Sequence, residues 1–90
     1  MVLMISYDLN RYDRPSSYQA VHEVIKKSAV SFKRPLYSQR FVETEGSVQT
    51  WSDLVASVVD QDDCWFVVRV TSPYQGWLPA DVWEWLAPRV

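Results

Sequence analysis

The sequence predicts one α+β domain, spanning residues 1–90, in the order strand, helix, strand, strand, helix, strand, followed by a short helix. Two apolar runs that contain β-branched and aromatic residues, 2–9 and 64–71, indicate the long strands. Two segments with helical periodicity, 16–28 and 47–58, indicate the main helices. Because 48% of the residues are hydrophobic, a chain of this length can bury a single packed core.

The first strand is predicted at Val2–Leu9, a nearly continuous apolar run that is too short for a helix core. Such a run is typical of a buried strand, so we expect it at the centre of the sheet. Because side chains alternate along a strand, its two faces differ in polarity. One face carries Leu3, Ile5, Tyr7 and Leu9, and the more polar face carries Met4, Ser6 and Asp8.

The first helix is predicted from Ser16 to about Ser28. Ser16 and Gln19 have the spacing of a capping box and follow Pro15. His22 lies at the boundary of the apolar stripe, and we expect it to pack rather than to act as an acid or base. The stripe itself consists of Tyr18, Val21, Val24 and Ile25.

Two short strands, Val30–Arg34 and Gln39–Thr44, are predicted to pair antiparallel, with Pro35 marking the bend between them. Gly46 and Ser47 then introduce the second helix. Its apolar residues recur with the i, i+3, i+4, i+7 spacing, which gives the helix a clear buried face. These residues are Trp51, Leu54, Val55 and Val58.

The last long strand is predicted at Cys64–Thr71, where Arg69 alone interrupts a run of aromatic and β-branched residues. We expect this strand to be buried, with Cys64 serving as a small hydrophobic residue. A Trp-rich extension, 72–90, follows it. This extension is predicted to form a turn and then a short helix at Pro79–Leu86.

This order of elements predicts a ferredoxin-like βαββαβ fold: a four-stranded antiparallel sheet with two helices on one face, plus the short C-terminal helix. Each half of such a fold is a split βαβ unit with a right-handed crossover. Both long helices then cover the same face of the sheet. The opposite face has to be hidden by the Trp-rich extension or by a partner.

The composition excludes several classes of site. One cysteine and one histidine rule out a disulfide framework within the chain and a zinc site that needs several such ligands. No apolar run of about 18 residues occurs, and no basic segment precedes the N-terminal apolar stretch, so we expect no membrane span, no signal peptide and a cytoplasmic location. The net charge of −2 argues against general nucleic-acid affinity, although residues 1–40 carry seven of the nine Lys and Arg residues.

Three stretches carry a resemblance to a known family: Met4–Leu9, Leu36–Thr44, and Asp62–Thr71 ahead of the Trp-rich extension. They resemble the small SinR-like proteins, which are similar to the smaller of the two CRISPR spacer-adaptation proteins and to the VapD endoribonuclease toxins. The resemblance covers almost the whole chain. It implies a homodimer that acts either as a metal-dependent nuclease on RNA or DNA or as a structural adaptor that binds DNA in a larger complex.

The resemblance also implies a site. In that superfamily an aspartate at the end of the first strand lies near the dimer axis and helps to hold a divalent metal, and Asp8 is the matching position. Two Asp8 carboxylates across a twofold axis would offer hard oxygen ligands to Mg²⁺ or Mn²⁺, which makes Asp8 the candidate catalytic and metal-binding residue. The alternative is an aspartate that caps a helix or orders the following loop. The exchanged fifth strand of the adaptation protein is replaced here by a predicted turn and helix, so the mode of dimerisation stays open.

Basic residues supply the candidate nucleic-acid contacts. Lys and Arg side chains interleaved with Phe32, Tyr37 and Phe41 are the mixture expected of a surface that neutralises phosphates and stacks bases. A solvated helix face and a charge-protected edge strand explain the same residues without a ligand. The candidates are Arg11, Arg14, Lys33, Arg34 and Arg40.

Aromatic residues supply the candidate interface. Their density in the Trp-rich extension is typical of interface anchors, and we expect them to join the more polar face of the first strand in a homodimer or partner interface. Alternatively, they cap the open sheet face within one chain. The interface candidates are Met4, Ser6, Trp77, Trp83 and Trp85.

Two functional classes therefore remain. One is a metal-dependent endonuclease that uses Asp8, with Mg²⁺ or Mn²⁺ as its cofactor, and acts on RNA or DNA as a homodimer. The other is a non-catalytic dimeric module that binds a protein or a nucleic acid, in defence or counter-defence as the resemblance implies. The sequence favours neither class strongly. The position of Asp8 after Tyr7 at a strand end supports the nuclease, whereas the lack of a second acidic ligand beside Asp8 and the acidic net charge weaken it.

Overall fold

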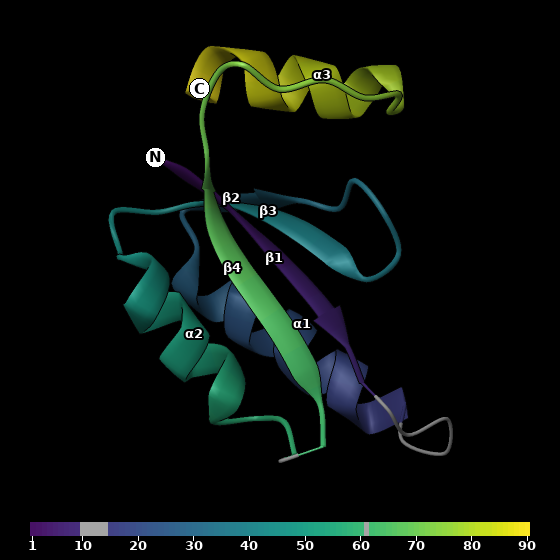
Figure 1. The fold of residues 1–90 in the computed structure, drawn as a ribbon, viewed down its shortest axis with the longest axis vertical. Helices are drawn as coiled ribbons and strands as arrows, with labels where there is room; N and C mark the ends of the chain where they lie inside the picture. Colours follow the sequence, from purple (N-terminus) through teal and green to yellow (C-terminus); the bar gives the residue numbers. More distant parts are fainter. Residues whose placement is uncertain (10–14, 61) are drawn as a thin grey trace.

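The computed structural model describes residues 1–9, 15–60 and 62–90, and for residues 15–17 it describes the backbone alone. Within these residues no helix is both long and apolar enough to cross a membrane. A one-turn 3₁₀ helix, Ala87–Arg89, closes the chain. The elements before it are β1 (Val2–Asp8), α1 (Pro15–Ser28), β2 (Ser31–Lys33), β3 (Gln39–Glu43), α2 (Val48–Ala56), β4 (Cys64–Val70) and α3 (Ala80–Leu86) (Figure 1).

The four strands form one antiparallel sheet in the order β2-β3-β1-β4, so the protein has an α+β fold. The prediction that the first strand is central is confirmed, because β1 pairs with both β3 and β4. Ile5 lies opposite Arg40 on one side and Val67 on the other. Residues directly opposite one another in antiparallel strands project to the same face, so this register decides which β3 side chains face the helices.

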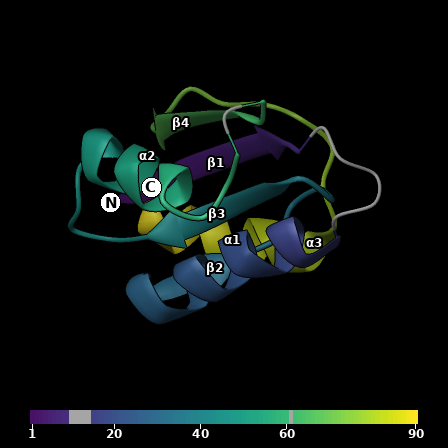
Figure 2. The same ribbon diagram turned by 90° about the horizontal axis from the view of Figure 1, so that it is seen from below.

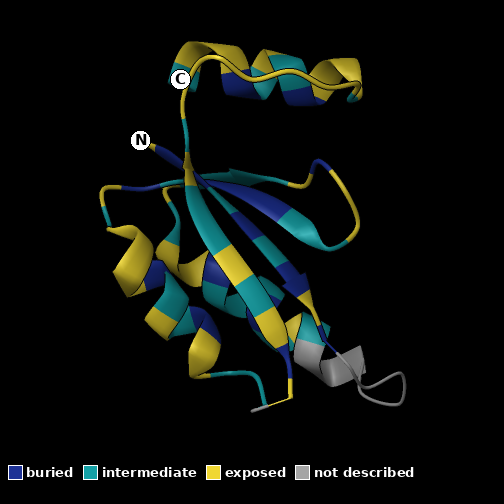
Figure 3. Cartoon of the chain, in the orientation of Figure 1, coloured by how far each residue is buried: buried dark blue, intermediate teal, exposed yellow. Residues whose placement is uncertain are grey.

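The main core lies between the sheet and the helices α1 and α2. The predicted alternation along β1 is confirmed, since Leu3, Ile5 and Tyr7 are buried in this core. From α1 it receives Val21 and Ile25, in line with the predicted stripe. Figure 3 shows buried residues recurring along β1 and on the inner sides of both helices.

Trp51 anchors α2 to the rest of the core. Its side chain is buried, and its indole Nε1 donates a hydrogen bond of 3.0 Å to the Thr44 hydroxyl. Ser47 caps the helix, accepting a hydrogen bond from the Thr50 backbone N–H. A Cβ at Gly46 would approach Trp51 Nε1 to 3.2 Å, so the absence of a side chain there allows the close packing.

The C-terminal helix α3 covers part of the opposite sheet face, on the side away from α1 and α2 (Figures 1 and 2). Val82 and Leu86 are buried there against Val2 and Phe41. Arg89 fixes the end of the chain, because its Nε donates to the Glu43 carboxylate at 2.8 Å. The extension thus supplies cover from within the chain, which was one of the two expected solutions.

The prediction that Cys64–Thr71 is a buried strand is wrong. Because β4 is an edge strand, nothing described pairs with its outer side. Phe66 is 64% exposed, and Cys64 is exposed rather than packed as a small hydrophobic residue. The aromatic and β-branched composition of β4 fits a sheet position but does not by itself determine whether that position is central or at an edge.

Candidate nucleic-acid interface

The candidate residues gather where β1 ends. There the Tyr7 backbone N–H donates to the Ser38 carbonyl oxygen at 3.0 Å, which ties the end of β1 to the turn between β2 and β3. Tyr7 and Asp8 project to opposite faces of the sheet. Two hollows lie near this end of the sheet: one is lined by Tyr18, Arg34 and Arg40, and the other is lined by Tyr7 and Asp8 together.

The first hollow, which we call the Arg–Tyr pocket, has a volume of about 410 Å³. One wall comes from α1, and the rest comes from β2, β3 and the turn between them. Arg40 faces this side because its register partner is the buried Ile5. The lining residues are Tyr18, Gln19, His22, Phe32, Arg34, Tyr37 and Arg40.

Arg40 is the most buried cation of the pocket, with 8% of the residue exposed. Its Nη1 donates to the carbonyl oxygens of Tyr37, at 3.2 Å, and Gln39, at 2.9 Å. Among the residues that the structure describes, no carboxylate forms an ion pair with it. Burial lowers the pKa of the Arg40 guanidinium. The pocket therefore holds a partly desolvated positive charge whose described hydrogen-bond partners are neutral.

Aromatic rings surround the two arginines. The Tyr18 ring lies 5.9 Å from Tyr7 and 5.9 Å from Tyr37, measured between centroids, and so joins the core to the surface. The Arg34 guanidinium lies 4.7 Å from the centroid of the Tyr37 ring, a cation–π contact. Burial raises the pKa of the Tyr7 phenol, and the positive charge of Arg40 opposes this effect.

His22 contributes to the pocket wall by packing. Its ring meets Phe32 edge to face at a centroid distance of 5.7 Å, as expected for a residue at the boundary of the apolar stripe. Gln19 donates from Nε2 to the Glu23 carboxylate at 2.8 Å, and Glu23 itself does not line the pocket. The described lining thus contains two guanidinium groups and no carboxylate.

Asp8 lies in the second hollow, at the exposed end of β1 and opposite Cys64 on β4. Its carboxylate makes no hydrogen bond or ion pair with a described residue, which leaves its oxygens accessible to a ligand. No cluster of three or more His, Cys, Asp or Glu side chains suited to a metal ion occurs in the described part of the chain. Asp8 would therefore need ligands from outside this group, such as a second copy of the chain.

The predicted basic surface is divided between the two faces of the sheet. Lys33 lies opposite Phe41 and forms an ion pair with Asp81 of α3 at 2.7 Å, so it is directed away from the Arg–Tyr pocket. Arg34 and Arg40 are brought together in the pocket. The predicted contacts of Arg11 and Arg14 fall outside the described residues.

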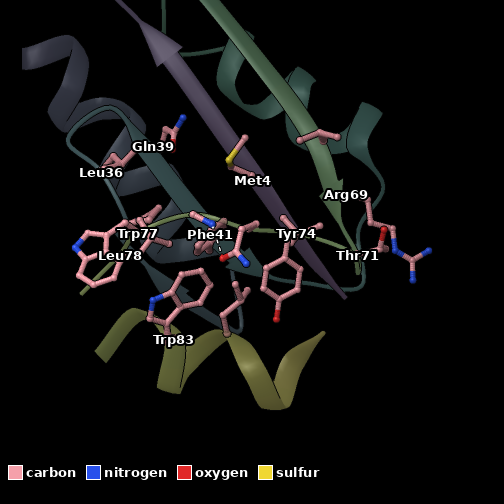
Figure 4. A pocket seen from close by; sticks show the side chains of 16 residues that line it. Met4, Leu36, Gln39, Phe41, Arg69, Thr71, Tyr74, Trp77, Leu78 and Trp83 are labelled. Carbon is pink, nitrogen blue, oxygen red and sulfur yellow. Dashed lines mark hydrogen bonds between the residues drawn. The ribbon is translucent and has the colours of Figure 1, made fainter. Parts of the chain in front are cut away.

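Three of the five interface candidates, Met4, Trp77 and Trp83, line an apolar hollow of about 450 Å³ between the sheet and α3, which we call the α3 groove (Figure 4). Met4 lies in its floor, and Ser6, further along β1, is half-buried. Trp83 stacks on Tyr74 at 6.2 Å between ring centroids.

The three tail tryptophans differ in their surroundings. Trp85 stacks on Phe41 at 6.3 Å and donates from Nε1 to the Ser31 hydroxyl at 2.9 Å. Trp83 and Trp85 thus pack within the chain, as in the capping alternative. Trp77, at the rim of the α3 groove, is 97% exposed.

Comparison with models of known protein families gives no match, and comparison with curated proteins gives no significant match. The function is therefore inferred from the residues of this chain alone. Sequence reasoning named Arg34, Arg40 and Tyr37 but assigned Tyr18 to the core. One feature of the sequence could have predicted that Arg40 faces the helices: if Val42 faces them, alternation along β3 places Arg40 on the same face.

Proposed function

We propose that this protein binds single-stranded RNA or DNA through the Arg–Tyr pocket. The observation that carries the proposal is the largely buried Arg40, whose guanidinium has no described carboxylate partner and lies in a pocket lined by aromatic rings. Cations that neutralise phosphates and rings that stack on bases are the two elements of sequence-tolerant single-strand binding. This is the binding-module class of function, and we propose the cytoplasm as its location.

We also infer that the fold is ferredoxin-like. The antiparallel strand order β2-β3-β1-β4 supports it, because β3 lies between β1 and β2 while β1 lies between β3 and β4. Helices α1 and α2 would then each complete a split βαβ unit. Kinship with the SinR-like proteins remains a proposal that rests on the three sequence stretches alone.

The binding proposal predicts a salt-sensitive affinity for single strands. Labelled single- and double-stranded RNA and DNA oligonucleotides would be titrated by fluorescence anisotropy at several salt concentrations. Replacing the exposed Arg34 by Gln should weaken single-strand binding and reduce the slope of log K against log salt by about 0.7, as expected for one lost phosphate contact.

The matched control is Lys27→Gln, at the exposed end of α1 and outside the pocket lining. It should alter binding less than Arg34→Gln. Absence of single-strand binding by the wild-type protein even at low salt would contradict the proposal, as would equal effects of the two substitutions.

A second candidate is the metal-dependent nuclease, favoured by the accessible carboxylate of Asp8 at the end of the central strand. It requires a dimer that brings two Asp8 side chains together. Pairing of two β4 edges would separate the two β1 strands by three strand spacings, roughly 14 Å, which is too far for a shared ion. The nuclease therefore needs face-to-face packing over the end of the sheet that carries Ser6 and Asp8.

For the nuclease, Asp8→Asn should keep the fold and lower the cleavage rate by at least about tenfold to a hundredfold, because the charge that attracts the cation is removed. A structural Asp8 would instead cost about 1 kcal/mol of stability and leave nucleic-acid binding intact. Cleavage of RNA and DNA would be assayed with Mg²⁺, with Mn²⁺ and with a chelator. If the wild-type protein cuts none of them, the nuclease candidate is rejected.

A further inference from the structure

We infer that the Arg–Tyr pocket binds the terminal phosphate of a nucleic-acid strand, a phosphomonoester, and so recognises the end of a strand rather than its interior. This inference rests on the proposed single-strand binding and adds to it a chemical preference. It follows from the unused donors of Arg40, from the depth of that residue and from the charge of the pocket.

The first observation is the free edge of the Arg40 guanidinium. Its Nη1 is occupied by the carbonyl oxygens of Tyr37 and Gln39, whereas Nε and Nη2 make no hydrogen bond to a described residue. No fully buried side-chain nitrogen or oxygen in the described residues lacks a partner, so these two nitrogens reach solvent. The edge formed by Nε and Nη2 presents parallel donors that match two oxygens of one phosphate.

The second observation is the difference in depth between the two arginines. Arg40 is 8% exposed, whereas Arg34 is exposed and lies over the Tyr37 ring. An internal phosphodiester carries chain on both sides and reaches cations along an open channel. A phosphomonoester is attached on one side only and presents three terminal oxygens, so it can enter a pocket and reach a recessed guanidinium.

The third observation is the charge. Two guanidinium groups share the pocket, and the described lining residues provide no carboxylate to balance them. A phosphomonoester carries a charge of about −1.5 to −2 near neutral pH, against −1 for a diester, and so balances the pair more completely. Tyr37, which is 70% exposed, then offers a ring on which the first base of the strand can stack.

The test compares single-stranded oligonucleotides of one sequence that carry a 5′-phosphate, a 3′-phosphate or only hydroxyl ends. We expect one phosphorylated end to bind about tenfold more tightly than the hydroxyl-ended strand, and a nucleoside monophosphate to compete for that difference. Arg40→Lys keeps the charge but removes the paired donors, so it should abolish the preference for the phosphorylated end. Arg34→Gln should weaken the binding of all three strands.

A measurement on the wild-type protein covers the case in which Arg40→Lys does not fold: the nucleoside monophosphate should raise the melting temperature, and the matching nucleoside should not. If the three oligonucleotides bind equally, the inference is overturned while the proposed single-strand binding stands. An end preference that survives in folded Arg40→Lys also overturns it. If no oligonucleotide binds, the proposed function fails, and the inference fails with it.

Discussion

Arg40 combines a position on the core side of the sheet with a charge that has to stay hydrated or hydrogen-bonded. Its place opposite Ile5 directs it toward α1, and its length lets the guanidinium reach the end of the sheet. The carbonyl oxygens of Tyr37 and Gln39 offset part of the desolvation that lowers its pKa. The sequence alone identified Arg40 as basic, but its burial depends on the register between β1 and β3.

The other candidate residues were predictable to different degrees. Arg34 and Tyr37 were expected at a nucleic-acid surface, and both line the Arg–Tyr pocket. Lys33 was expected there too, but its partner is Asp81, which is far away in sequence. The docking position of α3 creates that pairing, and no local pattern specifies it. Tyr18 was assigned to the core because helical periodicity predicts on which side of the helix a residue lies. It does not predict whether that residue also lines a pocket.

Trp51→Ala should lower the free energy of unfolding by about 3 to 5 kcal/mol, because it removes a large buried ring and leaves the Thr44 hydroxyl without its indole donor. Chemical denaturation followed by circular dichroism measures this loss. Val48→Ala, on the exposed side of the same helix, is the matched control and should change stability much less. An unchanged denaturation midpoint for Trp51→Ala would disprove the packing of α2 described above.

For β4 and α3, the sequence predicted the type of secondary structure but not the position of the element in the fold. The strand character of β4 was predicted from its composition, whereas its exposure follows from its place at the sheet edge. The helical character of α3 was also predicted, but the part of the sheet against which it packs was not. The position of α3 on the sheet is defined by long-range contacts, including the hydrogen bond from Trp85 to Ser31 and the ion pair between Arg89 and Glu43.

The packing of α3 on the sheet should weaken in acid, because protonation of Asp81 removes its ion pair with Lys33. The hydrogen bond from Lys33 holds the pKa of the Asp81 carboxyl below its ordinary value of 3.8. A carboxyl whose pKa is lower in the folded state stabilises the fold above its unfolded pKa, and this contribution is lost as the pH falls through the folded pKa. The effect is small because the Asp81 side chain is well exposed.

Urea denaturation of the wild-type protein and Asp81→Asn between pH 7 and pH 2 would test this expectation. The wild-type protein should be slightly more stable at pH 7, and the two stabilities should converge below about pH 3.8. A stability difference that is independent of pH would instead indicate that the substitution acts through packing or helix capping.

At the scale of the whole molecule, the two faces of the sheet are covered unequally. Helices α1 and α2 cover one face, whereas α3 covers only part of the other and leaves the α3 groove. Exposed apolar residues lie on or near this second face, at the groove rim or along the same side of β4. They are Leu36, Phe66, Tyr74 and Trp77. Patches of this kind commonly mark protein interfaces.

We therefore predict a homodimer that uses the sheet face carrying Met4 and Ser6 together with Trp77. Sedimentation velocity at micromolar concentration should detect the dimer, and Trp77→Ala should shift the population toward monomer by removing a large exposed anchor. Val30→Ser removes an exposed apolar residue elsewhere and should leave the dimer intact. A wild-type protein that sediments as a monomer at this concentration would contradict the prediction.

The late position of α3 in the chain has a consequence during synthesis on the ribosome. Every strand of the sheet emerges before residues 80–89, which supply α3 and the ion pair between Arg89 and Glu43. Until they emerge, Val2 and Phe41 lack the cover of Val82 and Leu86, so the sheet presents its apolar second face to solvent. A chain that ends before residue 80 should therefore bind chaperones through this face, and a chain that includes α3 should bind them less.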